Sequence, residues 1–247
     1  MLTRARPDAI ARPKRFYKAA ESGPVDGGWG VWLDGRPVRT PAGAVLATPT
    51  PSLAALIASE WSAQGEHIVL DEMTATRLAF TAVDRAAEAR EEVSDEIARR
   101  AGADVLCYFA EAPDGLVERE AAAWGPMLDW AGETLGLQLI RVRGLIHQAQ
   151  PQATLARAKA LALELSDFEL TGLVNAAGLF GSAVLAFALQ RGRLTGDEAL
   201  DLSRLDEAFQ EDQWGIDEDA AARTAHMRAE ASVLEQWFAA LSWRRAH

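Results

Sequence analysis

Cysteine is almost absent from this sequence, since its 247 residues include only Cys107. One cysteine cannot form a disulfide within the chain, and such scarcity is typical of proteins from a reducing compartment. Cys107 lies between apolar neighbours in the stretch DVLCYF, residues 104–109. We therefore expect a small buried hydrophobic side chain at this position rather than a reactive thiol.

Histidine is also scarce, and the four that occur are far apart: His67, His147, His226 and His247. None lies four residues from another, and none follows a glutamate by three residues. Those are the spacings by which histidines on a helix bind zinc or a carboxylate-bridged metal pair. We therefore expect no metal ligands and no cofactor.

Glycine and serine motifs of nucleotide-binding and acyl-transfer sites are missing as well. The run GPVDGGWG, residues 23–30, has neither the spacing of a dinucleotide-binding loop nor the Lys-Ser/Thr pair of a phosphate-binding loop. Ser182 stands in LFGSAV without the flanking glycines of a nucleophile elbow. We predict no catalytic residues and a protein that is not an enzyme.

A membrane-spanning signal is weak. Residues 170–189 carry no charge over the length of a membrane span, but three glycines and the polar Thr171, Asn175 and Ser182 dilute their hydrophobicity. Neither flank is strongly basic. We expect a helix buried on all sides at the centre of a soluble bundle and no stable membrane insertion.

The N-terminus lacks the apolar core of a secretory signal. Residues 1–14 are rich in arginine and are interrupted by Pro7 and Pro13, which break any long helix. We expect a flexible basic tail. Because this tail is short for a presequence, we expect a bacterial cytoplasmic protein, with the mitochondrial matrix as the alternative.

Positive charge is in deficit over most of the chain, and the net charge is −11. Up to residue 80 there are nine Lys/Arg against eight Asp/Glu, and beyond it sixteen against twenty-eight. An acidic surface disfavours nucleic acid and anionic membranes, because both require cationic contacts. It favours a protein partner of basic or mixed charge.

The first eighty residues read as β-rich. In WGVWLDGRPVRTP, residues 29–41, Asp34 and Gly35 supply the positive φ angles of a two-residue hairpin turn. Pro37 cannot donate a hydrogen bond to a neighbouring strand, so its strand should lie at an edge. A short helix is expected from Pro51 onward.

Beyond Met73, apolar residues recur at spacings of three and four, which indicates helices. We expect them near residues 75–101, 116–135, 151–165, 168–190, 196–214 and 217–242. The sequence therefore predicts an α+β protein in which a small β-rich N-terminal domain precedes a larger α-helical bundle domain. The expected divisions are the tail at 1–14, the β-rich domain with one short helix at 15–80, and the α-helical domain at 81–247.

Residues 197–219 hold ten acidic residues and one basic residue, Arg204. On a single helix of about 3.6 residues per turn, Leu202, Leu205 and Phe209 form an apolar stripe. The opposite face then carries Arg204, Glu207, Glu211 and Trp214, and Gly215 follows the helix end. An outward-facing tryptophan surrounded by carboxylates has the composition of a protein-interface hot spot. Two alternatives to a protein interface stay open. The acidic face is merely solvated, or Trp214 folds beneath the next helix.

The run LSRLDEAFQEDQWG, residues 202–215, resembles the signature of a family of assembly chaperones. These proteins bind the alpha subunit of the soluble catalytic sector of ATP synthase in mitochondria and related alphaproteobacteria. The resemblance covers nearly the whole chain after residue 14, because further motifs follow in the order of the family. They are RFYK at 15–18, LDGRPVRTPAG at 33–43, LAALIASEW at 53–61, TRLAFTAVD at 76–84, DVLCY at 104–108 and MLDW at 127–130. The sequence departs from the family pattern at Met73-Thr74, Phe109, Glu120, Gly125 and Asp206.

The resemblance implies a non-enzymatic function, in which the chain binds the unassembled alpha subunit and prevents its self-association before the beta subunits join. It implies partner-facing or surface-shaping roles for Asp206, Glu207, Gln210, Trp214 and Gly215, to which the helical projection adds Glu211. Trp61 matches a tryptophan of the family, and its place on an apolar helix face indicates a structural role.

Two other functions stay open from the residues alone. A hydrolase or lyase would use two carboxylates, such as Glu207 and Glu211, and would need a deep pocket that contains both. An adaptor for an unrelated basic protein would present the same acidic surface. For a chaperone of the alpha subunit we expect a monomer.

Overall fold

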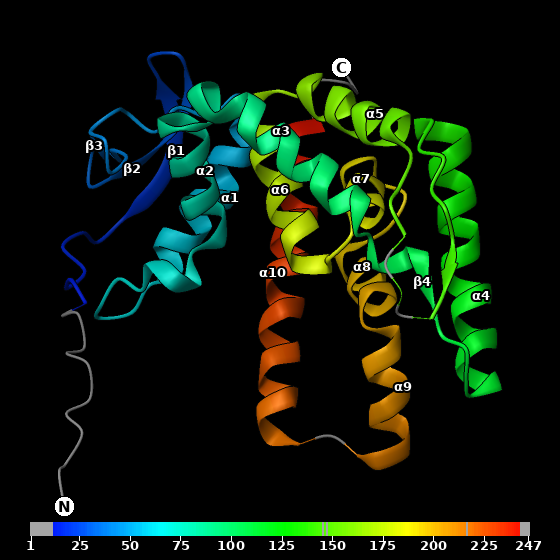
Figure 1. Cartoon of the computed structure of the whole chain (residues 1–247). Helices are drawn as coiled ribbons and strands as arrows, with labels where there is room; N and C mark the ends of the chain where they lie inside the picture. The colour runs from blue at the N-terminus through cyan, green and yellow to red at the C-terminus, as the bar shows by residue number, and fades with distance from the viewer. Residues whose placement is uncertain (1–11, 145, 147, 216, 243–247) are drawn as a thin grey trace, which may run out of the picture.

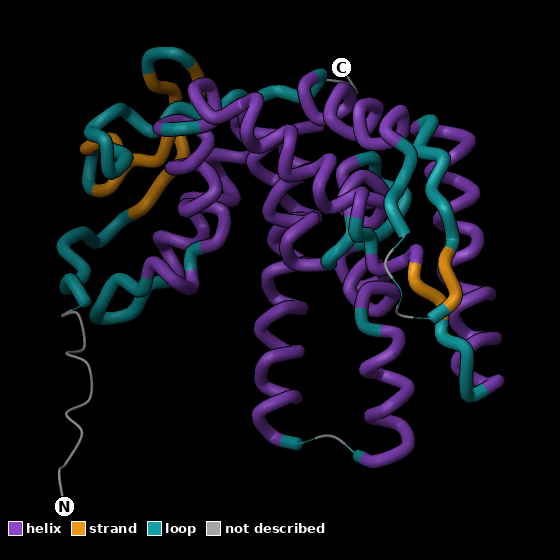
Figure 2. Tube along the Cα trace, viewed as in Figure 1, coloured by secondary structure: helices purple, strands orange, loops and turns teal. Residues whose placement is uncertain are grey.

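The computed structural model describes residues 12–144, 146, 148–215 and 217–242. A small antiparallel sheet lies at the N-terminal end, and helices make up most of the rest (Figures 1 and 2). The predicted α+β class is therefore confirmed. Most of the predicted tail lies outside the described residues, although Lys14 forms a β-bridge with His67.

The sheet has the order β1-β2-β3 and consists of β1 (Ala20–Val25), β2 (Gly28–Leu33) and β3 (Arg36–Pro37). Asp34 and Gly35 turn the chain between β2 and β3 with φ angles of 47° and 78°. Pro37 lies in the edge strand. The hairpin and the edge position are both as the sequence predicts.

Helix α1 (Pro51–Ala63) packs against β1 and β2 and covers the sheet. Thr50 caps it, because its Oγ1 accepts a hydrogen bond from the N–H of Leu53 at 3.1 Å. Leu53, Ile57 and Trp61 are buried on its inner face. The short helix η1 (Leu70–Glu72) then leads into the helical part of the chain.

The single helix expected at 75–101 is divided into α2 (Thr74–Asp84) and α3 (Ala86–Gly102). Arg85 leaves the helical conformation, with φ −136° and ψ −24°. The break lets α2 pack against α1 and α6 while α3 packs against α5 and α6. The domain boundary placed after residue 80 stays a prediction, and α2 spans that position.

The central helices surround the uncharged segment. It forms α6 (Asp167–Phe180) and α7 (Ala183–Gln190), which are separated by Gly181 at a φ of 63° and by Ser182, the cap of α7. All eight residues of α7 are buried, as expected for the centre of a bundle. Among the described residues, no helix has both the length and the apolar character needed to span a membrane.

One side of the bundle is built from short elements around a long helix. In chain order they are η2 (Val105–Cys107), β4 (Tyr108–Phe109), α4 (Asp114–Trp130), the π-helix η3 (Ala131–Leu135), β5 (Val142–Arg143) and α5 (Gln152–Leu163). The strands β4 and β5 pair in parallel. Cys107 is fully buried, and burial raises the pKa of its thiol to about 12, in agreement with an inert side chain.

The C-terminal part comprises α8 (Gly196–Ser203), α9 (Leu205–Trp214) and α10 (Glu218–Ser242). Thr195 and Glu198 form a capping box at the start of α8. The expected helix 196–214 is interrupted at Arg204, with φ −114° and ψ 21°. In Figure 1, α9 and the first half of α10 project together from the body of the molecule.

Candidate partner-binding surface

Helix α9 is attached to the body along one face, through its contacts with α4 and α8. Phe209 is 9% exposed and lies against α4, where the Arg119 guanidinium is 5.1 Å from the centre of its ring. The Nε1 of Trp124 on α4 donates to the carbonyl of Leu202 at 2.9 Å, just before α9 begins. These contacts fix which face of α9 is directed outward.

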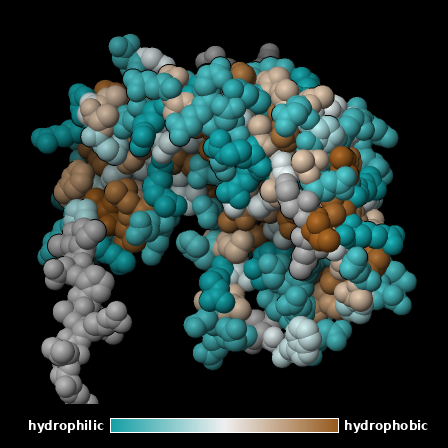
Figure 3. Space-filling view, in the orientation of Figure 1, coloured by the Kyte–Doolittle hydropathy of each residue, from teal (hydrophilic) through white to brown (hydrophobic). Residues whose placement is uncertain are grey.

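The outward face ends at Trp214, which is 81% exposed. Glu207 and Gln210 are exposed on the same helix, and Asp217, Glu218 and Asp219 are exposed at the start of α10. We call these six residues and Gly215 the acidic tip. The projecting region is largely hydrophilic in the space-filling view (Figure 3). Trp214 is therefore not folded beneath the next helix.

Gly215 ends α9 in a conformation that suits glycine, with φ 85° and ψ 169°. Its N–H donates to the carbonyl of Glu211 at 2.8 Å, which closes the last turn. Gly215 thus terminates the helix directly after the exposed tryptophan, as predicted.

Glu211, one of the candidate carboxylates, is directed inward. It forms an ion pair with Arg204 at 3.0 Å, and the side chains of Glu211 and Arg204 are only 24% and 19% exposed. The helical projection put Glu211 and Arg204 on the outer face because it assumed one uninterrupted helix. The break at Arg204 rotates α9 relative to α8, so that this ion pair lies against the body.

Asp206 is half-buried and faces α4, where it meets Glu120. Glu120 is 0% exposed, and burial raises the pKa of its carboxyl group to about 7. From the sequence alone, Glu120 is only a departure from a family pattern. The sequence does contain a signal for the burial of Glu120. Leu116, Glu120 and Trp124 follow one another at a spacing of four, which is the spacing of one helix face, and all three lie on the buried face of α4.

Trp61 lies far along the chain from the acidic tip and is 6% exposed in α1. Its ring packs edge-on against Tyr17 at 5.7 Å, and the hydroxyl of Tyr17 donates to the carbonyl of Trp61 at 2.7 Å. These contacts join the segment before β1 to α1. The structural role assigned to Trp61 stays a prediction, for which its burial supplies the physical basis.

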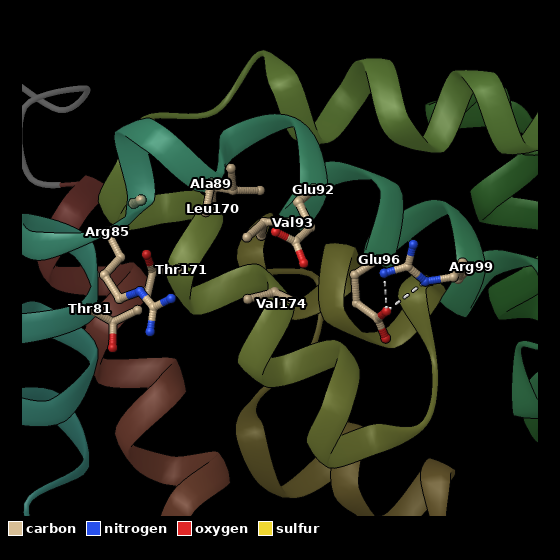
Figure 4. Close-up of a pocket in the computed structure, with 11 residues that line it drawn as sticks. Thr81, Arg85, Ala89, Glu92, Val93, Glu96, Arg99, Leu170, Thr171 and Val174 are labelled. Carbon is tan, nitrogen blue, oxygen red and sulfur yellow. Dashed lines mark hydrogen bonds and ion pairs between the residues drawn. The ribbon is translucent and has the colours of Figure 1, made fainter.

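A hollow of about 410 Å³ lies between α3 and α6 (Figure 4). Glu96 and Arg99 pair at one end of it, and Leu170 and Val174 line its floor. Three further hollows lie between α3 and α5, between α6 and α10, and at the end of α7 beside α10, and none of these four hollows is lined by Glu207 or Glu211. Within the described part of the chain, no group of three or more His, Cys, Asp and Glu is placed to hold a metal ion.

Comparison with known proteins gives consistent results. Residues 14–132 match the model of the family described as ATP12 chaperone protein. The crystal structure of Atp12 from Paracoccus denitrificans is 37% identical over 92% of this chain and 97% of that chain, with a TM-score of 0.84. A putative chaperone from Agrobacterium tumefaciens is 37% identical over 96% and 92% of the two chains, with a TM-score of 0.87. The mitochondrial protein atp12 of Schizosaccharomyces pombe is 26% identical over 219 residues, which span 84% of this chain and 75% of that protein. The chain therefore belongs to the ATP12 chaperone family.

Proposed function

We propose that this chain is a molecular chaperone for ATP synthase assembly that binds the unassembled alpha subunit and prevents its self-association before the beta subunits join. The observation that carries the proposal is the likeness to Atp12 over nearly the full length of both chains. The alpha subunit is the client that the family resemblance implies. A protein client also agrees with the net charge of −11.

The acidic tip supplies a physical basis for client binding. Trp214 offers a large apolar surface, and the carboxylates around it select a partner of opposite charge. An isolated subunit exposes apolar interface that promotes aggregation. A small surface with one aromatic anchor covers part of that interface while still permitting release.

Within this surface we assign direct contacts to Glu207, Gln210 and Trp214, whose side chains are exposed. Gly215 shapes the turn that presents them. Asp206 and Glu211 act through the placement of α9, since both are directed toward the body of the protein. We propose a monomer in the bacterial cytoplasm, with the mitochondrial matrix as the alternative location.

Copurification tests the identity of the client. The tagged chain is mixed separately with unassembled alpha subunit and with unassembled beta subunit of the same ATP synthase. We expect capture of alpha and not of beta. Equal capture of both, or of neither, by a folded chain would contradict the proposal.

A further inference from the structure

Glu120 is a fully buried acid that the proposed client contacts do not use. It lies on the inner face of α4, and its Oε2 accepts a hydrogen bond from the N–H of Ala110 at 2.6 Å. Its other oxygen, Oε1, is buried and has no hydrogen-bond donor among the described residues. Burying a carboxylate oxygen without a hydrogen-bond donor costs free energy of folding. This cost indicates that a neighbouring group supplies a proton to the oxygen.

That partner is the carboxyl group of Asp206 at the start of α9. Its Oδ1 is likewise buried without a hydrogen-bond partner among the described residues, and a side-chain hydrogen bond with Asp206 is one of the causes that raise the pKa of Glu120. Two ionised carboxylates are both acceptors, so a hydrogen bond between them requires one proton. A single shared proton supplies the donor that both orphaned oxygens lack.

The surroundings favour this protonated form. Burial raises the pKa of Glu120, the hydrogen bond from Ala110 opposes that shift, and the hydrogen bond and charge of Asp206 add to it, giving a pKa of about 7. The nearby arginines do not neutralise the pair, because Arg119 contacts Asp212 and Arg204 contacts Glu211.

Other ionisable groups stand on the elements that pack against α4, but α7 carries none. They are Cys107 on η2, Tyr108 on β4, Glu111 after β4, Glu133 on η3, and Arg204, Asp206, Glu207, Glu211 and Asp212 at or on α9. On α4 itself they are Asp114, Glu118, Arg119 and Asp129. Of the ionisable side chains, Asp206 is the one that contributes to the raised pKa of Glu120, through a hydrogen bond and through its charge.

We propose that the Glu120–Asp206 carboxyl pair is a proton-dependent clamp that holds α9 against α4. With one proton the pair is a buried hydrogen bond between the two helices. Without it two like charges face each other, one of them at the fully buried Glu120, and α9 separates more readily from α4. The proton exchanges with water each time the contact opens.

The direction of the pH dependence follows from where the proton is held more tightly. In the open state Glu120 is hydrated and has the ordinary glutamate pKa of about 4.3, whereas in the docked state its pKa is raised. The docked state therefore binds more protons between these two values, and docking weakens as pH rises through that window. Above about pH 7 the carboxyl is ionised in both states, and the effect levels off.

The clamp concerns client binding because α9 carries Glu207 and Trp214. In that respect, the inference rests on the proposed function. The clamp itself is tested on the free chain, without any client. Failure of the clamp and failure of alpha capture are therefore separate results.

The experiment is amide hydrogen exchange of α9 across pH 5.5 to 7.5, corrected for intrinsic exchange and referred to the amides of α6. In the wild type we expect protection of α9 to fall by about tenfold or more over this range. In Glu120→Gln the amide carbonyl accepts from Ala110 and the amide nitrogen donates to Asp206 at every pH. We expect protection in this variant to be independent of pH.

Two further variants make the test decisive. In Asp206→Asn the new amide nitrogen donates to Glu120 at every pH. We expect this variant to remove the pH dependence of protection in α9 as well. Glu118→Gln changes an exposed acid on the same helix and should keep the wild-type profile. A wild-type profile that does not change with pH, or an unaltered slope in both Glu120→Gln and Asp206→Asn, would overturn the proposal.

Discussion

We propose that single side chains decide both the stability of the N-terminal part and the capacity of α9 to bind a client. Trp61 and Trp214 show how the same residue type takes opposite roles. The first is 6% exposed beneath the sheet, and the second is 81% exposed at the end of a projecting helix. Burial determines which of them contributes to folding and which is free for recognition.

Replacement of Trp61 by arginine should destabilise the fold severely. The change Trp61→Arg removes the ring contact with Tyr17 and puts an unpaired charge into the core. We expect a loss of about 3–5 kcal/mol in the free energy of unfolding, measured by thermal or denaturant unfolding. Trp214→Arg makes the same chemical change at an exposed site and should alter stability by no more than about 0.5 kcal/mol. Equal stability of the two variants would refute the structural role of Trp61.

Reversal of charge at Glu207 should affect binding but not folding. Its side chain is exposed on α9, so Glu207→Lys leaves the core intact while placing a positive charge in the acidic tip. We expect capture of the alpha subunit to weaken by about tenfold with an unchanged melting temperature. Glu21→Lys, an exposed acid on β1, makes the same change in net charge and serves as the control. Equal weakening by both variants would indicate a general charge effect instead of a local contact.

Helices and turns show what the sequence could predict at the level of elements. The hairpin turn at Asp34-Gly35, the start of α1 at Pro51 and the end of α9 at Gly215 were all predicted, because each depends on a few adjacent residues. The breaks at Arg85 and Arg204 were not predicted, because both lie inside continuous apolar periodicity without proline or glycine. Their position depends on how the adjoining helices pack.

The same limit applies to the candidate surface. The helical projection put Trp214 on the outer face but left open that it folds beneath the next helix, and the structure exposes it. The inward positions of Asp206 and Glu211 were missed, because they depend on the rotation at Arg204 and on Glu120, which is 86 positions before Asp206 in the chain. Contacts between distant segments are not contained in local periodicity.

The turn after α9 should tolerate no side chain at Gly215. Gly215→Ala forces alanine into backbone angles that glycine alone adopts readily, at a cost of about 1–3 kcal/mol. Because the tip projects from the body, we expect the last turn of α9 to fray while the core stays folded. Hydrogen exchange should show lower protection in that turn and unchanged protection in α6. Gly65→Ala, at an open position without a positive φ, is the matched control; if Gly215→Ala exchanges as slowly as this control, the assigned strain is absent.

In the molecule as a whole, the buried core and the proposed binding surface lie in different places. The buried core runs from the sheet through α6 and α7 to the second half of α10. The acidic tip is carried beyond this core by α9 and the first half of α10 (Figure 1). If the acidic tip binds the client as we propose, the chain can bind and release it without disturbing its own core, because the tip residues are exposed.

We propose that Trp214 anchors the alpha subunit. The most direct measurement is the Kd of purified alpha subunit for the wild type, for Trp214→Ala, and for Ile146→Ala, which truncates another apolar side chain of similar exposure (84%). We predict that Trp214→Ala weakens binding by about thirtyfold, the effect of a hot-spot residue, and that Ile146→Ala changes it by less than about twofold. Undiminished binding by a folded Trp214→Ala variant would contradict the account.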